Sequence, residues 1–350
     1  MLSFCDKIKE STSFLCQYQN FKDKYFISGN AIIVSFPQSE KQNGAIIMKC
    51  AIIDVGSNSI RLAIYQVKEE KFRILFTQKV TAGLAGYVEK KRLSERGIQR
   101  ACEVLLEYLD ILHNFHIEDY YIVATASLRN IENTREAAEE ILRVTGCHVD
   151  VISGEEEACL AYIGALHNVH VESGVLVDIG GSSTELVQFR DRRILRAVSV
   201  PIGSLSLFSR FVEKILPKKK EYQAIMEEIH RLLEQAELND YECDIVCGVG
   251  GTVRNALKLN NYLFNESAAN NTVSAEHLEY ISKLLANRDT TARNLILKVC
   301  PERIHTIIPG LCVLNDIMDR FGAQKLVVSH YGVREGYLYD KVLKQSEGEN

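Results

Sequence analysis

Two blocks of the chain share one pattern of apolar runs separated by short polar turns. Each block opens with three runs of strand length, at residues 51–55, 59–67 and 72–80 in the first block and at residues 175–179, 183–189 and 194–199 in the second. Short apolar runs bounded by glycine and polar residues predict β-strands. The repetition therefore predicts an α/β protein built from two similar halves, with a cleft between them.

Segments with helical spacing follow the three strands in both blocks. In residues 94–113, the apolar residues Ile98, Cys102, Leu105 and Leu109 recur at the spacing of one helix face. Further helices are predicted at residues 133–146, 155–166, 205–215, 221–238 and in several pieces of 251–323, with strands at 120–124, 149–152, 244–247 and 325–329 and a terminal helix after them.

The two blocks give the expected domain limits. Residues 48–165 are predicted to form the first domain and residues 166–346 the second, with the terminal helix packing back on the first and residues 347–350 as a tail. Residues 1–47 do not belong to the pattern. We interpret them as a non-native or loosely ordered extension, because Met48 stands directly ahead of the first strand. The alternative is a genuine N-terminal subdomain, since residues 31–36 are compatible with a strand.

Composition and charge limit the class of protein. Of the 350 residues, 46% are hydrophobic and 25% charged, as in globular proteins, and no apolar run approaches the length of a membrane span. The ten cysteines are scattered, which favours reduced thiols and a cytoplasmic location. A net charge of −5 argues against nucleic-acid binding, so a polyanionic substrate would need a local basic strip; residues 90–92 and 218–220 are candidates.

A glycine-rich acidic turn stands between the first two strands of each block. The first turn contains Asp54, Gly56, Ser57, Asn58 and Ser59, and the second contains Asp178, Gly180, Gly181, Ser182, Ser183 and Glu185. Glycine lets backbone N–H groups point into a turn, hydroxyl groups add donors, and aspartate supplies a hard oxygen ligand for a divalent cation. Two such turns facing each other are suited to a phosphate chain with its metal.

This repeat resembles the paired phosphate loops of the sugar-kinase, actin and heat-shock ATPase superfamily. Within that superfamily it looks like the exopolyphosphatase/guanosine-pentaphosphate phosphohydrolase family, in its short two-domain form, over residues 48–346. The resemblance implies two ribonuclease-H-like α/β domains with an interdomain cleft. Two departures stand out: Ser182 replaces a common third glycine, and the segment after Val80 lacks an arginine.

The resemblance assigns roles to several residues. Glu157 matches the family's water-activating base, whereas the plain interpretation is an exposed charge in a first helical turn. Arg129 matches a phosphate-binding arginine, with a surface ion pair as the alternative. Asp54 and Asp178 would hold Mg²⁺ (or Mn²⁺), and Glu185 would be a further carboxylate near the metal. The glycines, serines and asparagine of the two turns would clasp phosphate.

Three other matches have less specific meaning. A third glycine-rich turn at residues 247–252 is expected to bound the cleft or to meet a further stretch of substrate. A motif at residues 329–336 is expected to pack at the domain junction. Arg61 and Arg303 also fit family positions, with a structural role as the alternative.

The expected function is that of a Mg²⁺-dependent exopolyphosphatase that releases terminal phosphate from inorganic polyphosphate. The first alternative is hydrolysis of guanosine pentaphosphate (pppGpp) or another nucleotide 5′-phosphate, because the motifs are shared. Alternatives of another class are a phosphotransferase and a non-catalytic sensor of alarmone or polyphosphate. The resemblance also implies a homodimer, with neither nucleic acid nor membrane as a partner.

Overall fold

Two similar six-stranded sheets form the frame of the molecule. The computed structural model describes residues 26–28, 31–33, 41–42, 45–68, 71–287 and 289–343. The first sheet has the strand order β10-β9-β4-β5-β6, with β3 beside the start of β4, and the second has the order β13-β12-β11-β14-β16-β15. In both sheets the first three strands are antiparallel and the fourth pairs in parallel with the first. The predicted duplication is therefore confirmed.

The elements of the first half follow the predicted order. They are β4 (Ala45–Val55), β5 (Ile60–Lys68), β6 (Lys71–Val80), η2 (Leu84–Tyr87), β7 (Val88–Glu89), β8 (Arg92–Leu93), α2 (Glu95–Asn114), β9 (Tyr120–Ala124), α3 (Ala126–Arg129), α4 (Thr134–Thr145) and β10 (Asp150–Val151). Ahead of them lie β1 (Phe26–Ser28), β2 (Ala31–Ile33) and β3 (Lys41–Gln42). Most of the predicted extension 1–47 lies outside the described residues. Strand β4 nevertheless begins ahead of Met48, and the suspected start there stays a prediction.

The second half contains more helices. Its elements are α5 (Gly154–Asn168), β11 (Gly174–Ile179), β12 (Thr184–Arg190), β13 (Arg193–Val200), α6 (Ser204–Phe211), α7 (Lys219–Glu234), β14 (Ile245–Val249), α8 (Gly250–Phe264), β15 (Thr272–Ser274), α9 (Ala275–Ala286), α10 (Thr290–Val299), η3 (Pro301–Arg303), α11 (Ile307–Arg320), β16 (Lys325–Val328), α12 (Val333–Tyr337) and η4 (Leu338–Leu343). Several helical segments were predicted to fill residues 251–323, and the edge strand β15 within that range was missed by sequence analysis.

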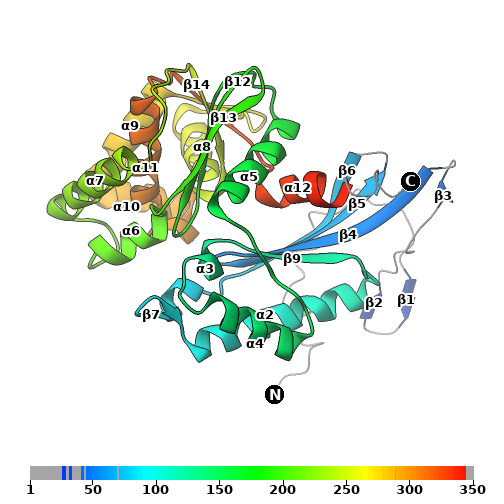
Figure 1. Ribbon diagram of the computed structural model, residues 1–350. Coiled ribbons are helices and arrows are strands. Elements are labelled where there is room, and N and C mark those ends of the chain that lie inside the picture. The colour runs from blue at the N-terminus through cyan, green and yellow to red at the C-terminus, as the bar shows by residue number, and fades with distance from the viewer. Residues whose placement is uncertain are drawn as a thin grey trace.

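Apolar packing explains the layers seen in Figure 1. Helices α2 and α4 cover one face of the first sheet, where Ile53, Leu105 and Ile141 share a core. Helices α6 to α11 cover one face of the second sheet around a larger core that includes Leu186 and Leu314. No helix in the part of the chain that the structure describes is long and apolar enough to cross a membrane.

Helices α5 and α12 lie between the two sheets (Figure 1). Ala161 of α5 packs in a cluster with residues of the second sheet, whereas Leu160 of α5 and Tyr337 of α12 pack against residues of the first. The two helices cross closely at two glycines. A Cβ added at Gly336 would collide with the carbonyl of Leu160, and one added at Gly164 would collide with the carbonyl of Gly332. This junction holds the first turn of α5 between the halves. The predicted domain boundary at residue 165 stays a prediction.

Candidate active site

The two glycine-rich turns have matching backbone geometry. In the first loop (residues 56–59), the N–H of Gly56 donates to the carbonyl of Ser59 at 3.2 Å. In the second loop (residues 180–183), the N–H of Gly180 donates to the carbonyl of Ser183 at 2.9 Å. Each loop therefore closes on itself in the same way where two antiparallel strands meet, as the sequence predicted.

A helical turn holds the carbonyl groups of each loop. In the first loop, the carbonyls of Ser57 and Asn58 accept hydrogen bonds from the start of η2, at residues 83 and 85. In the second, the carbonyls of Gly180 and Gly181 accept hydrogen bonds from residues 204–206 at the start of α6. Within the described chain, no acceptor takes the N–H groups of Ser57, Asn58, Gly181 or Ser182. Such N–H groups in successive turn residues suit an anion.

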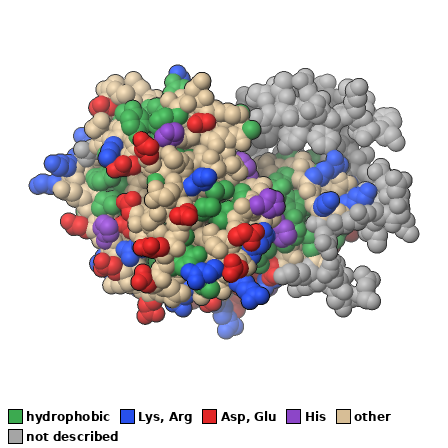
Figure 2. Space-filling view, turned by 90° about the horizontal axis from the view of Figure 1, so that it is seen from above, with side chains coloured by type: hydrophobic (Ala, Val, Ile, Leu, Met, Phe, Trp, Pro, Cys, Tyr) green, Lys and Arg blue, Asp and Glu red, His purple; other side chains and the backbone are tan. Residues whose placement is uncertain are grey.

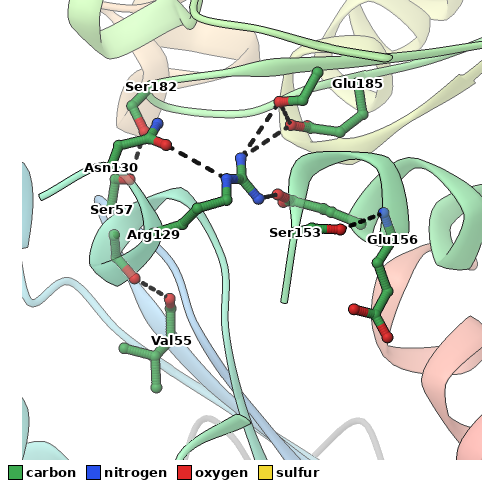
Figure 3. Close-up of polar contacts among 11 residues, drawn as sticks. Val55, Ser57, Arg129, Asn130, Ser153, Glu156, Ser182 and Glu185 are labelled. Carbon is green, nitrogen blue, oxygen red and sulfur yellow. Dashed lines mark hydrogen bonds and ion pairs between the residues drawn. The ribbon is translucent and has the colours of Figure 1, made fainter. Parts of the chain in front are cut away.

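The two loops touch each other across the cleft. The hydroxyl groups of Ser57 and Ser182 lie 2.5 Å apart and share a hydrogen bond (Figure 3). Ser182, the residue that departs from the family pattern, thus supplies a side-chain contact between the halves that glycine does not offer. The loops are brought to opposite walls of one site.

A cavity of about 130 Å³ opens between these walls. It is lined by twelve of the thirteen predicted site residues: Asp54, Gly56, Ser57, Asn58, Ser59, Glu157, Asp178, Gly180, Gly181, Ser182, Ser183 and Glu185. Arg129 is the predicted residue that does not line it. The structure therefore brings these residues together in one cavity, while their assignment as a functional site and their roles stay predictions.

Glu157 reaches the cavity from the first turn of α5. The hydroxyl of Ser153 caps that helix by accepting the N–H of Glu156 at 3.1 Å, as Figure 3 shows. The Glu157 residue is only 7% exposed, unlike the exposed Glu155 two residues earlier. Burial raises the pKa of Glu157 to about 7, against the opposing effect of Arg129. A carboxyl group with such a pKa is matched to base catalysis near neutral pH.

Arg129 directs its side-chain nitrogens at protein acceptors rather than at the cavity. Its Nη1 donates to Glu157 Oε2 at 2.5 Å, its Nη2 to the hydroxyl of Ser199 at 3.3 Å, and its Nε to Asn130 Oδ1 at 3.4 Å. A longer ion pair of 3.7 Å joins Nη2 to Glu185 (Figure 3). The predicted phosphate contact of Arg129 stays a prediction, while the structure shows its contact with the candidate base.

Three further carboxyl groups face the cavity. Burial raises the pKa of Asp54 and of Asp178, and nearby arginines oppose the rise in both cases. Burial and the charge of Glu157 raise the pKa of Glu185 well above its ordinary value, and that residue is 1% exposed. Among the residues the structure describes, no group of three or more acidic, histidine or cysteine side chains is arranged as a complete metal site. Any cation here would therefore need other ligands besides these carboxylates.

Arginine side chains line the rest of the cavity. Arg61, Arg254, Arg303 and Arg334 come from β5, α8, η3 and α12. Arg334 lies 3.9 Å from Glu335, whereas within the described part of the chain the guanidinium groups of Arg61, Arg254 and Arg303 make no hydrogen bond and no ion pair. Burial and the neighbouring arginines lower the pKa of Arg254 to about 10. Asp54 lies near Arg61 and Asp178 near Arg254, but neither pair forms a hydrogen bond, so the guanidinium N–H groups can bind an anionic ligand.

Sequence analysis missed Arg254 and did not place Arg334 in the site. The signal for Arg254 was its position near the start of the helix that begins in the third glycine-rich turn. Strand register places Arg61 in the site. Arg61 on β5 lies opposite Asp54 on β4, just as Glu185 on β12 lies opposite Asp178 on β11. The two halves thus place opposite charges at equivalent positions.

The third glycine-rich turn supports this arrangement. Gly250 has a φ of +88°, and a Cβ there would lie 2.5 Å from Asp178 Oδ1. A Cβ at Gly251 would collide with the guanidinium of Arg303. The turn bounds the cavity, as predicted, and lets an acidic and a basic side chain approach the backbone closely.

The two basic runs predicted as candidates for substrate binding, residues 90–92 and 218–220, lie away from the cavity. Lys218 is the N-cap residue of helix α7 and pairs with Glu213 at 2.5 Å, while Lys90 and Lys91 form the left-handed turn between β7 and β8. None of these lysines lines the cavity. On the face shown in Figure 2, acidic and basic side chains are interspersed rather than gathered by sign. The basic groups of the site are its arginines.

Comparisons with known proteins agree with the geometry. The model of the Ppx/GppA phosphatase family matches residues 63–345. The chain is 27% identical to a Haemophilus influenzae protein named "Putative exopolyphosphatase", over 86% of this chain and 93% of that one. The crystal structure of the Aquifex aeolicus Ppx/GppA family member superposes with a TM-score of 0.71 at 28% identity, covering 85% of this chain and 99% of that one.

A third relative supports the fold alone. The structure of an exopolyphosphatase from Cytophaga hutchinsonii has a TM-score of 0.75 at 22% identity and covers 85% of this chain and 98% of that one. The fold is therefore that of the actin-like ATPases, with two ribonuclease-H-like halves, as predicted. Because the family model spans most of the sequence, the chain belongs to the Ppx/GppA phosphatase family and is a phosphatase.

Proposed function

We propose that this protein is an exopolyphosphatase, which releases terminal orthophosphate from inorganic polyphosphate. The observation that carries the proposal is the cavity itself, in which Glu157 and the two loops face the unpaired guanidinium groups of Arg61, Arg254 and Arg303. Several phosphates in a row present enough negative charge to satisfy several arginines at once. The name of the Haemophilus influenzae relative supports the same substrate.

The residues that line the cavity also favour a substrate without a nucleobase. Among the described residues that line the cavity, His330 is the single aromatic side chain. A guanine or adenine ring would ordinarily stack on an aromatic or wide apolar face. Inorganic polyphosphate has no such ring and needs only charge and hydrogen-bond donors. We therefore rank polyphosphate above pppGpp, which remains the alternative substrate.

The chemistry proposed for the site is direct attack of water on the terminal phosphorus. Glu157 would orient the water and accept its proton at a carboxylate oxygen, since its pKa of about 7 lets it act as a base near neutral pH. The N–H groups of the two loops and the arginines would stabilise the charge that develops on the phosphoryl oxygens. The pair of loops would align the terminal phosphate with the water.

The carboxylates of Asp54 and Asp178 fit a divalent cation. Neither side chain accepts a hydrogen bond from another described residue, so their oxygens remain available as ligands. Magnesium is commonly held by one or two carboxylates, water and substrate phosphates, so it does not need a complete set of protein ligands. Mg²⁺ or Mn²⁺ would be held by Asp54 and Asp178, with Glu185 nearby, and would neutralise phosphate charge when bound.

Phosphate release with Mg²⁺, compared on polyphosphate, pppGpp and ATP, tests the proposal. Wild type should turn over polyphosphate, and Glu157→Gln should lose about 10²- to 10⁴-fold in kcat. Glu155→Gln is the matched control, because Glu155 lies in the same helical turn but is exposed. A loss below tenfold for Glu157→Gln would reject its role as base.

The comparison of the three substrates separates the alternative functions. Turnover of pppGpp alone would make this a nucleotide phosphohydrolase, and tight binding without turnover would make it a sensor. Transfer of phosphate to an acceptor other than water would favour a phosphotransferase. The family resemblance also leads us to propose a cytoplasmic homodimer, and light scattering that gives a monomer at working concentration would reject the dimer.

A further inference from the structure

The hydroxyl of Ser199 connects two charged side chains behind the cavity. Ser199 lies on β13, and its Oγ donates a hydrogen bond to Glu185 Oε1 at 2.8 Å. The same oxygen accepts a hydrogen bond of 3.3 Å from Nη2 of Arg129. Ser199 does not line the cavity, so it has no route to the reacting atoms except through these partners.

Arg129 carries the contact onward to the candidate base. The guanidinium extends from α3, at the end of β9, and its other terminal nitrogen donates to Glu157. The hydroxyl of Ser127, in the same short helix, donates to the carbonyl of Val55 and so fixes α3 to the first sheet (Figure 3). A guanidinium is planar and rigid, so restraining one terminal nitrogen also restrains the other.

The contact also joins the two halves of the molecule. Arg129 lies in α3, which follows β9 of the first sheet, whereas Ser199 lies on β13 of the second sheet. Gly154 begins α5, the helix that carries Glu157. A Cβ at Gly154 would collide with Ser199, so strand and helix meet there without a gap. Ser199 therefore stands where the arginine, the base and the second sheet converge.

We infer that Ser199 is a positioning residue, which holds the Arg129 guanidinium in the orientation that aims the Glu157 carboxylate at the attacking water. The inference rests on the proposed role of Glu157 as base. Hydrogen-bonded groups behind a catalytic side chain commonly fix its orientation in this way. Loss of the hydroxyl should lower kcat and leave KM nearly unchanged, since no substrate contact is removed.

A matched pair of substitutions isolates the hydroxyl. Threonine and valine have nearly the same shape, so Ser199→Thr keeps the hydroxyl and Ser199→Val replaces it with a methyl group. Ser199→Val should lower kcat by about tenfold, the order expected for one hydrogen bond to a charged group, and Ser199→Thr should keep most activity. Equal losses in both variants would indicate packing and overturn the inference.

A double-mutant cycle with Arg129→Met tests the route. If Ser199 acts through Arg129, then Ser199→Val should cause less than a twofold further loss once Arg129 is gone. A full tenfold loss in that background would assign the effect to Glu185 and overturn the inference. The charged groups that face Glu157 are Arg129, Asp54, Asp178 and Glu185.

A measurement without substrate keeps this test independent of the proposed function. Rotation of the Arg129 guanidinium can be followed by ¹⁵N NMR of the intact protein, with the signal assigned by its loss in Arg129→Met. Rotation should be slow in wild type and in Ser199→Thr, and several-fold faster in Ser199→Val. Unchanged rotation in Ser199→Val would overturn the inference, whereas failure of wild type to hydrolyse polyphosphate would instead reject the proposed function.

Discussion

The pKa of Glu157 leads to a quantitative prediction for the pH dependence of catalysis. Burial places this pKa at about 7, whereas an ordinary glutamate has a pKa near 4.5. The ionised fraction of Glu157 is then about 0.1 at pH 6 and about 0.9 at pH 8. Because the base must be ionised, kcat/KM should rise by about tenfold between these pH values. An unperturbed glutamate, already ionised at pH 6, would give almost no rise.

The assay is initial-rate phosphate release from polyphosphate at fixed Mg²⁺, with kcat/KM measured from pH 5 to 9. The substrate also titrates, so residual activity of Glu157→Gln supplies the baseline that contains the substrate's contribution alone. Carbon-13 NMR of the Glu157 carboxyl in metal-free protein gives the pKa without turnover. Arg129→Met should shift the acid limb to higher pH, because Arg129 opposes the rise in pKa.

A flat profile from pH 6 to 8, together with an NMR pKa near 4.5, would refute the burial argument. It would mean that Glu157 is solvated in solution and that its low exposure of 7% does not govern its ionisation. An acid limb that persists in Glu157→Gln would assign the titration to another group. An added cation near the site should move the limb to lower pH, since it favours the ionised carboxylate.

Three further perturbations test the surroundings of the site. Gly251→Ala should raise KM for polyphosphate at least fivefold in steady-state kinetics, because the new Cβ displaces the guanidinium of Arg303; an unchanged KM would remove Arg303 from the substrate path. Ser182→Gly removes the hydroxyl contact between the two loops and should raise KM about two- to fivefold, an effect that Ser182→Ala must share if the hydroxyl is responsible. Tyr65→Phe should lower the free energy of urea unfolding by about 1–3 kcal/mol, because the phenol donates to the buried carboxylate of Glu335 at 2.7 Å, and an unchanged value would show that the carboxylate finds another donor.

Local sequence patterns were sufficient to predict the strands, helices and turns that form the frame of the protein. Strand, turn and helix signals lie in contiguous residues, so the two strand–turn–strand units and the helix that begins with Glu157 could be predicted from local pattern. The internal repeat then implied two similar halves with the loops facing each other. Twelve of the thirteen predicted site residues line one cavity, because a glycine-rich turn keeps its chemistry within a few residues.

Which charged side chains lie close together depends on the tertiary structure. Arg254 and Arg334 are far apart in the chain, and local periodicity carries no information about the wall that either one faces. The same holds for Arg129, which matched a phosphate-binding pattern but pairs with Glu157, and for Ser199, which gives no sequence signal. The pKa of Glu157 likewise depends on burial between two halves, since solvent exclusion is a property of packing rather than of any local segment.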